Sequence, residues 1–406
     1  MTNKQYFTVI LILGALATIS PFSIDMYLPG FPAIASDLQT SISNVQLSLT
    51  SYFIGIAIGQ LLYGPLLDRY GRKIPLYAGL TIYILASIGC AFTTSVESLI
   101  IMRFIQALGG CAGMVAAQAL VRDLFPVNKT AQAFSFIILV IAVSPMVAPT
   151  LGGYLTSAFG WHSIFIILAV ITAGIMVGVH YVLPQGSLPD TTMSLRLKPV
   201  FKSYYEVLLE PQFLLYMLAG GIATAAPFAY ISGSADVFMN MYGLNEQQYG
   251  WIFAILAFAM IGTTQLNHFL LKRFSSEQII QFTLIYQSIV GMFLVIGTWL
   301  NWFNLPIFVL LIFIFLTGEG LSSPNAAALT LAPFSQRAGS ASALMGCFRM
   351  AMGGMVSALV SVIHNHTAVP MVVLMTLCAI IGLLVLLAGK NKLRLHLSKV
   401  ELTKPL

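Results

Sequence analysis

The sequence predicts an all-α membrane protein with twelve transmembrane helices. Of its 406 residues, 58% are apolar and only 8% are charged, whereas soluble globular chains have about 25% charged residues. Apolar windows of about 20 residues, the length of a membrane-spanning helix, recur along the whole chain. In hydrocarbon every backbone N–H and C=O must be bonded within the protein, so these windows are expected to be helices. A β-barrel would instead show alternating segments of about ten residues, and the sequence contains none.

The predicted spans follow one another with short connections. They cover 7–28, 45–66, 75–93, 98–121, 132–156, 163–183, 212–235, 247–270, 278–300, 303–324, 339–362 and 367–389. The first is expected to remain in the mature chain, because it is too long for a signal-peptide core and no small-residue cleavage site precedes Pro21. The count depends most on 278–324, where only "NWFN" separates two spans.

Positive charges between the spans fall on alternate connections. Every Lys and Arg outside the spans lies at a chain end or in a connection on the same side as both ends, and the opposite connections 29–44, 94–97, 157–162 and 236–246 contain none. Cytoplasmic connections carry an excess of Lys and Arg. We therefore expect both termini in the cytoplasm, and we attribute the net charge of +6 to topology rather than to nucleic-acid binding.

A polar connection divides the spans into six and six. We expect an N-terminal half at 1–183, a cytoplasmic linker at 184–211, a C-terminal half at 212–389 and a cytoplasmic tail at 390–406. A weak internal sequence similarity supports two parallel half-repeats. Span 1 contains "SPFSIDMYLPGF" and span 7 contains "APFAYISGSADVF", and each has Pro-Phe followed by an acid near the outer end.

The connection between spans 2 and 3 contains an unusual group of charges. In "GPLLDRYGRK" one acid and three bases fall within six positions. Arg69 and Lys73 fit simple topology anchors, but an acid at a cytoplasmic helix end contributes little to orientation. Asp68 could pair with Arg72 or with a helix N-terminus. Such a pair could hold two helices together in one conformation and release them in another.

This group resembles the G-x-L-x-D-R-x-G-R-K signature of the major facilitator superfamily, in its expected place between spans 2 and 3. Four further stretches resemble the bicyclomycin-resistance/CflA subfamily of drug:proton antiporters, namely "SIDMYLPGFPAIASDL", "MRFIQALGGCAG", "MVAPTLGG" and "AGSASALMGCFRMAMGG". The resemblance covers the full length and implies the major facilitator fold. It also implies a cytoplasmic gate formed by Gly64, Asp68, Arg69, Gly71, Arg72 and Lys73.

Two charged residues lie inside spans of the first half, where each costs roughly 3 kcal/mol or more. Asp25 and Arg103 fall at comparable depth in the outer halves of spans 1 and 4, so they could approach each other. Burial disfavours the charged form of a carboxyl group, which suits Asp25 for proton exchange. The resemblance implies a proton-coupling role for Arg103 and an aspartate at the place of Asp25. The alternative is a permanent ion pair that only joins the two helices.

The second half also has charges within its spans. Arg349 lies near the middle of span 11 and Glu319 lies in the inner part of span 10, so the two could form a charge pair. For Arg349, contact with a substrate or anion in the cavity is the alternative, whereas Glu319 favours a structural or gating role. Asp236 and Glu246, near the outer end of span 7 and its loop, are expected to be solvated.

Span 5 contains "SPMVAPTLGG", which resembles the antiporter motif G-x-x-x-G-P-x-x-x-G-G. Pro149, Gly152 and Gly153 match it, whereas Ser144 and Ala148 replace its first two glycines. Proline removes a backbone hydrogen bond and small residues permit close helix approach. We therefore expect span 5 to bend and to pack against the other half. Ordinary small-residue helix packing is the alternative.

Missing motifs narrow the function further. The sequence has no G-x-x-x-x-G-K-[ST] loop, which excludes direct nucleotide hydrolysis of that type. The four cysteines lie far apart within spans, and His364 and His366 lie in an outer loop without further ligands, so neither a metal nor a cofactor is expected. We expect a transporter, not an enzyme.

The resemblance implies proton-coupled efflux of drug-like or other small amphipathic molecules by alternating access in a bacterial inner membrane. The expected partners are the substrate, protons and the lipid bilayer, and the protein is expected to be a monomer. Three alternatives remain at this point: a dedicated exporter of a native metabolite such as a siderophore or an amino acid derivative, an uptake symporter, and a membrane sensor that transports nothing.

Overall fold

The chain is helical throughout the part that its computed structural model describes. That part comprises residues 3–184, 186, 189, 197–334, 338–365 and 367–402, and it contains no strand. Twelve helical segments within it are long and apolar enough to cross a membrane, which confirms the predicted number. The first and tenth segments extend furthest beyond the predicted ends, as Gln5–Asp37 and Leu305–Leu331.

Several spans are interrupted or joined by short elements. The first six spans are formed by α1 (Asn3–Asp25) with η1 (Leu28–Gly30) and α2 (Phe31–Asp37), then by α3 (Ile42–Tyr70), α4 (Lys73–Ala91), α5 (Val96–Leu124), α6 (Val127–Phe159) and α7 (His162–Val182). The linker contains α8 (Leu197–Leu208). The last six spans are formed by α9 (Pro211–Ala223) with α10 (Ala226–Ala235) and the π-helix η2 (Asp236–Met241), then by α11 (Glu246–Leu270), α12 (Ser276–Trp299), α13 (Leu305–Leu331), α14 (Ala338–Val362) and α15 (Val369–Leu402).

Local sequence explains where several helices begin. The side chains of Ser41 and Ser95 accept hydrogen bonds from the first turns of α3 and α5. At the start of α11, Asn245 and Gln248 form a reciprocal capping box. Such caps satisfy backbone N–H groups that have no partner within the helix. These three spans therefore begin at defined residues.

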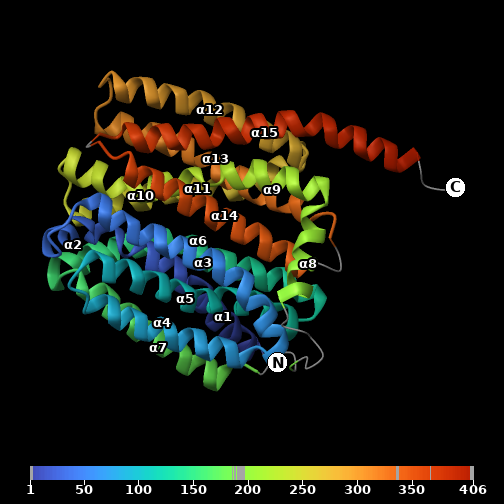
Figure 1. Ribbon diagram of the computed structural model, residues 1–406, viewed down its shortest axis with the longest axis horizontal. Coiled ribbons are helices and arrows are strands. Elements are labelled where there is room, and N and C mark those ends of the chain that lie inside the picture. Colours follow the sequence, from blue (N-terminus) through green and yellow to red (C-terminus); the bar gives the residue numbers. More distant parts are fainter. Residues whose placement is uncertain are drawn as a thin grey trace.

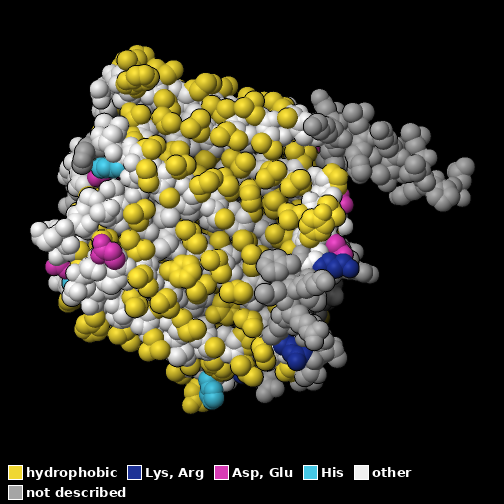
Figure 2. Space-filling model, viewed as in Figure 1, with side chains coloured by type: hydrophobic (Ala, Val, Ile, Leu, Met, Phe, Trp, Pro, Cys, Tyr) yellow, Lys and Arg dark blue, Asp and Glu magenta, His cyan; other side chains and the backbone are white. Residues whose placement is uncertain are grey.

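The outer surface matches a lipid environment. In Figure 2 hydrophobic side chains cover the middle of the visible face, whereas the visible Lys and Arg lie at its right edge. Leu85, Val170 and Phe282 are examples of large apolar side chains that are more than 60% exposed. Apolar residues on this surface agree with the predicted spans, because lipid takes the place of water around them.

The two halves of the chain form two groups of helices (Figure 1), with α1 to α7 in the lower part of the view and α9 to α15 in the upper part. Two helix pairs join the groups: α3 packs against α14, and α6 packs against α11. We call the end of the bundle where α8 lies the linker end, and the end where α2 and η2 lie the far end. The division at 183/184 and 211/212 stays a prediction, and part of the linker and the last residues of the tail lie outside the described residues.

The far end is closed by direct contacts between the halves. Thr50 of α3 hydrogen-bonds to Ser357 of α14 at 2.9 Å, and the Ser361 hydroxyl donates to the Ser43 carbonyl at 2.5 Å. Deeper in the same interface, the rings of Phe53 and Phe228 meet edge to face at 4.8 Å. The linker end instead contains a cavity lined by both halves.

Candidate functional site

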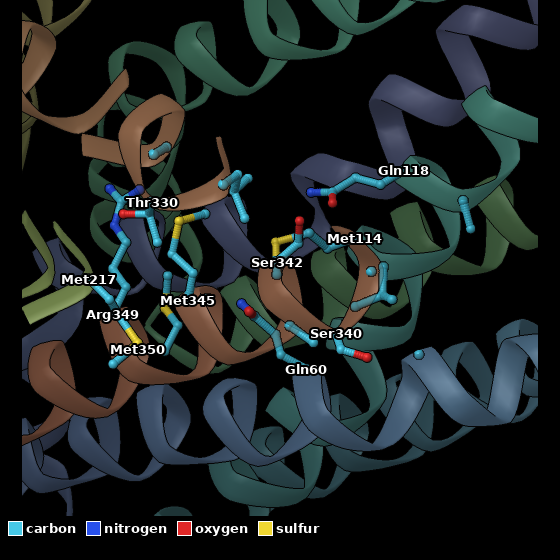
Figure 3. A pocket seen from close by; sticks show the side chains of 18 of the residues that line it. Gln60, Met114, Gln118, Met217, Thr330, Ser340, Ser342, Met345, Arg349 and Met350 are labelled. Carbon is cyan, nitrogen blue, oxygen red and sulfur yellow. The ribbon is translucent and has the colours of Figure 1, made fainter. Parts of the chain in front are cut away.

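The cavity at the linker end has a volume of about 1050 Å³ and reaches the surface at Arg122 and Asp68. This volume is enough for a drug-sized molecule. Figure 3 shows its inner wall, where methionines alternate with amides and hydroxyl groups. The labelled side chains other than Arg349 are Gln60, Met114, Gln118, Met217, Thr330, Ser340, Ser342, Met345 and Met350. The sequence alone did not indicate which methionines line a cavity.

One ion pair lies at the cavity wall. Arg349 of α14 donates through Nη2 to Oε1 of Glu319 in α13 at 3.1 Å, so the structure contains the charge pair considered for spans 10 and 11. The Arg349 side chain is 39% exposed and lines the cavity. The Glu319 side chain is only 5% exposed and lies behind the arginine, outside the cavity lining. A molecule in the cavity would therefore meet the guanidinium first.

A second charge cluster lies at the mouth of the cavity. Arg72 donates to Asp68 at 2.5 Å and to Asp123 at 2.7 Å. Partial burial alone would lower the pKa of Arg72, but the hydrogen bonds and negative charges of Asp123 and Asp68 outweigh it, so its pKa lies above the usual value. Of the two partners considered for Asp68, Arg72 and a helix N-terminus, the structure shows Arg72.

Asp123 was missed by sequence reasoning, although it shares the signal that singled out Asp68. It lies in "RDLFP" at the linker end of α5, where an acid contributes little to orientation. The cluster joins the α3–α4 connection to α5, both within the first half. Gly71, with φ of 79°, lies in the turn between α3 and α4, and a Cβ there would lie 3.2 Å from Pro189 of the linker. Gly64 lines the cavity with open space around it, and Arg69 and Lys73 flank the turn.

Arg103 is the largest fully buried side chain of the described chain. Its guanidinium donates to Oε1 of Gln106 at 2.7 Å and to the Ser23 carbonyl at 3.0 Å. The rings of Tyr27 and Tyr52 lie 4.5 and 4.2 Å from its central carbon. Aromatic faces attract a cation and replace part of its lost hydration. No carboxylate contacts Arg103 among the described residues, and its Nε has no partner there.

Asp25 ends α1 and is 4% exposed. The structure does not pair it with Arg103; within the described chain no hydrogen bond or ion pair reaches its carboxyl group. Its electrostatic neighbours are instead the buried phenols of Tyr230 and Tyr249, from α10 and α11 of the other half. The Tyr230 hydroxyl is itself buried without a hydrogen-bond partner. Asp25 therefore faces the closed interface at the far end and does not line the cavity.

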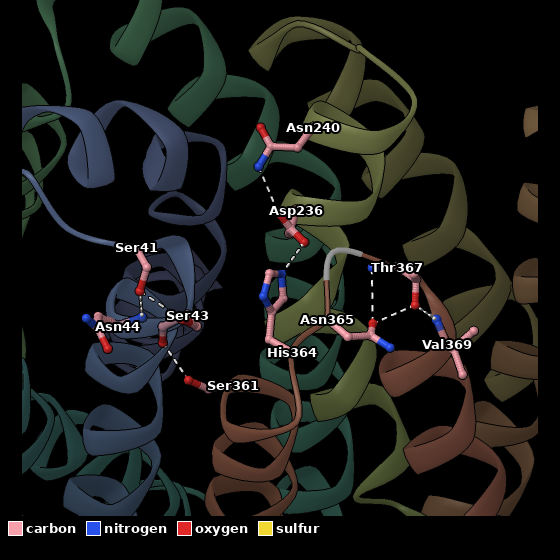
Figure 4. Close-up of polar contacts among 10 residues, drawn as sticks. All are labelled: Ser41, Ser43, Asn44, Asp236, Asn240, Ser361, His364, Asn365, Thr367 and Val369. Atoms are coloured by element: carbon pink, nitrogen blue, oxygen red, sulfur yellow. Dashed lines mark hydrogen bonds and ion pairs between the residues drawn. The ribbon is translucent and has the colours of Figure 1, made fainter.

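The expectation that Asp236 is solvated is wrong. Figure 4 shows its carboxylate between Asn240 and His364; both contacts measure 2.7 Å, and the residue is only 4% exposed. Span 7 continues through η2, so Asp236 lies inside the helix rather than in a loop. The α14–α15 connection then brings His364 against it. His366 lies outside the described residues.

The motif in span 5 lies at an interface between the halves. A Cβ at Gly153 would lie 2.5 Å from the Glu246 carbonyl oxygen of α11, and one at Gly250 would lie 2.8 Å from Thr150 of α6. Gly152 faces its own half, where a Cβ would lie 2.0 Å from the Met26 carbonyl oxygen. The predicted contact of span 5 with the other half is therefore observed, with Pro149 inside α6 beside it.

Comparisons with known proteins agree over most of the chain. Residues 13–358 match the family model described as Major Facilitator Superfamily. A bicyclomycin resistance protein homolog of Haemophilus influenzae is 32% identical over 382 residues, which cover 94% of this chain and 96% of that protein. An uncharacterized MFS-type transporter of Bacillus subtilis is 34% identical, with 94% and 95% covered.

More distant proteins extend the same result. Multidrug resistance protein D of Escherichia coli is 28% identical over 393 residues, which cover 95% of this chain and 96% of that protein. Among solved structures, a D-xylose-proton symporter superposes with a TM-score of 0.74 over 95% of this chain and 97% of the symporter. At 15% identity this likeness concerns the fold alone.

Proposed function

Because this chain belongs to the major facilitator superfamily of membrane transporters, we propose that it exports small amphipathic molecules, drugs among them, in exchange for protons. The single observation that supports this most is the drug-sized cavity between the halves, open at one end of the bundle and closed at the other. Relatives named for multidrug and bicyclomycin resistance favour export over uptake. The linker end faces the cytoplasm in this proposal, because the positively charged connections lie there.

Transport proceeds by alternating access in this proposal. In the state described, substrate enters the cavity from the cytoplasm. The contacts of α3 with α14 and of α6 with α11 at the far end then open, and the linker end closes around the Asp68–Arg72–Asp123 cluster, which acts as the cytoplasmic gate. Rocking of two half-repeats about a central site is the usual motion of such folds. The small residues at 152 and 153 permit α6 to move closely against its neighbours.

Asp25 carries the exchanged proton in this proposal. An isolated carboxylate is costly to bury, whereas a protonated carboxyl group is much less so. We therefore expect Asp25 to take up a proton from the far side when that end is open and to keep it as the far end closes. Substrate that then enters the cavity from the cytoplasm displaces this proton to the cytoplasmic side, so proton and substrate cross in opposite directions. Arg103 modulates this exchange, because its side chain already binds the Ser23 carbonyl two residues away. In this proposal Arg103 contacts Asp25 only in another conformation, which agrees with the absence of that contact from the present state.

The test is substrate-induced proton release from the purified protein in weakly buffered detergent solution. Addition of bicyclomycin or chloramphenicol, candidates suggested by the names of two relatives, should release protons from the parent but not from Asp25→Asn. Asp37→Asn is a matched control, because Asp37 lies in the same span but its side chain is 54% exposed. Normal release from Asp25→Asn would contradict the assignment.

The direction of transport is tested separately in inside-out membrane vesicles. An exporter accumulates the compound inside such vesicles when their interior is acidic, and collapse of the pH gradient abolishes the accumulation. A symporter would instead move the compound together with protons out of the acidic interior, so the two functions give opposite signs in one assay.

A further inference from the structure

We propose that the cavity selects uncharged and acidic molecules that are rich in hydrogen-bond acceptors, and that it discriminates against organic cations. This deepens the proposed function and rests on it for the role of the cavity as the transport site. The inference depends on which charges, donors and aromatic rings face the cavity.

No carboxylate of the described chain is available to a cation deep in the cavity. Asp68 and Asp123 are the two acids of the lining, and both lie at the mouth and bind Arg72. Glu319 is nearly fully buried behind Arg349. A cation would therefore lose its hydration without gaining a counter-ion, and burying such an unpaired charge is costly.

The charged group that does face the inner cavity is the guanidinium of Arg349. One of its terminal nitrogens binds Glu319, and the side chain remains 39% exposed. A guanidinium has five N–H donors in a planar fork that suits carboxylate and carbonyl acceptors. Gln60 and Gln118 add amide groups from the opposite half. Because Glu319 neutralises part of the positive charge, neutral acceptors are accommodated as well as anions.

Aromatic rings, the other means of holding an organic cation, are scarce in the cavity. Among the described residues its lining contains no Phe or Trp, although the chain has 27 Phe. The two tyrosines of the lining are nearly buried, Tyr204 at 8% and Tyr216 at 2% exposure, so their rings offer little surface to a cation. Four methionines, Met114, Met217, Met345 and Met350, are among the large apolar side chains of the lining. They adapt to varied shapes, which permits a range of substrates without a preference for positive charge.

Three probes with the same fluorophore test this inference: dansylglycine, with a carboxylate; dansylglycinamide, which is neutral; and a dansylamide with a trimethylammonium group. Their fluorescence is titrated with the purified full chain in an uncharged detergent at neutral pH. We expect the carboxylate and amide probes to bind at least about tenfold more tightly than the ammonium probe. The ammonium group would lie near the Arg349 guanidinium, with no unpaired carboxylate to stabilise it.

Variants of the ion pair identify the source of the preference. Arg349→Gln should remove the advantage of the carboxylate probe over the amide probe, whereas Arg349→Lys should retain most of it. Glu319→Gln should strengthen binding of the carboxylate probe, because the guanidinium is no longer neutralised. If Arg349→Gln does not fold, the double variant Arg349→Gln/Glu319→Gln replaces it, because no buried charge is left unpaired. Arg122→Gln at the mouth is the matched control and should change the ranking little.

Tightest binding of the ammonium probe, equal binding of all three probes, or binding of none would overturn the inference. These outcomes are distinct from failure of the proposed function. A cavity that prefers the carboxylate and amide probes in a protein that does not couple flux to protons would contradict only the proposed exchange. Proton-coupled transport with a preference for cations would contradict only the substrate class.

Discussion

Replacement of Gly153 by alanine is expected to open the far end of the molecule. Gly153 lies where α6 meets α11 of the other half, and an added Cβ would lie 2.5 Å from the Glu246 carbonyl oxygen and 2.9 Å from its carbon. These are backbone atoms, so no side chain can rotate away. The contact is nearly an ångström shorter than ordinary van der Waals contact, and the two helices must separate to relieve it.

The magnitude follows from the size of the overlap. Insertion of a methyl group into a well-packed interface costs about 1–3 kcal/mol. Since the clash exists only while the far end is closed, most of this cost falls on the present state. At 1.4 kcal/mol for each factor of ten, the equilibrium between closed and open far ends should shift by roughly 5- to 150-fold.

Distance measurements by electron paramagnetic resonance can detect this shift. Spin labels at Ser36 of α2 and Val362 of α14 report the separation of the halves at the far end, in a background without the four native cysteines, which are all free. Gly153→Ala should enlarge the population with long distances. Gly174→Ala is the matched control, because a Cβ there meets nothing within 4 Å. An unchanged distribution, or an equal change in the control, would refute the assignment of Gly153 to a moving interface.

Three further predictions concern ionisable side chains. His364→Phe should leave Oδ2 of the buried Asp236 carboxylate without its histidine partner and lower the stability of the protein in detergent by about 1–3 kcal/mol, seen as a lower melting temperature; an unchanged melting temperature would mean that the pair contributes nothing. Arg72→Gln should leave Asp68 and Asp123 repelling each other, so stability should fall at low ionic strength and recover in part on addition of salt, which screens the repulsion; a loss of stability independent of salt would contradict this. Arg103→Lys should reduce transport strongly while probe binding in the cavity is retained, because an ammonium cannot reproduce both hydrogen bonds and the ring contacts; normal transport by this variant would contradict a role in coupling.

Sequence patterns predicted the spans well because a lipid environment acts on every residue of a helix. Twenty apolar residues in a row have few structural alternatives in a bilayer, and the number of spans agrees with the structure. The Arg349–Glu319 pair was proposed for a related reason, since opposite charges in adjacent spans lower each other's cost of burial. Side-chain partners that depend on how helices rotate were not predictable. Asp25 and Arg103 share a depth, but they face different neighbours.

The wrong prediction that Asp236 is solvated has a specific physical cause. Its distance along the chain placed it at the end of span 7, but the π-helical segment extends that span beyond Asp236, and Asp236 is buried within it. The partner, His364, comes from a connection 128 residues later. No local pattern encodes such a contact. Asp123, in contrast, could have been found, because it is an acid at the linker end of a helix just as Asp68 is.

The similarity between spans 1 and 7 gives each half an acid beyond its Pro-Phe pair, Asp25 four residues after Pro21 and Asp236 nine residues after Pro227, and both acids are 4% exposed. Their surroundings differ in a way that bears on mechanism. Asp236 is bound by His364 and Asn240, so its charge is stabilised within one half whatever the other half does. Asp25 has no such partner in the described chain, and its electrostatic neighbours Tyr230 and Tyr249 belong to the opposite half. Movement between the halves therefore changes the surroundings of Asp25 far more than those of Asp236. A proton site can couple proton flow to transport only if its surroundings change with that movement. This is the physical reason to assign the coupling to Asp25 in the first half and a structural role to Asp236 in the second.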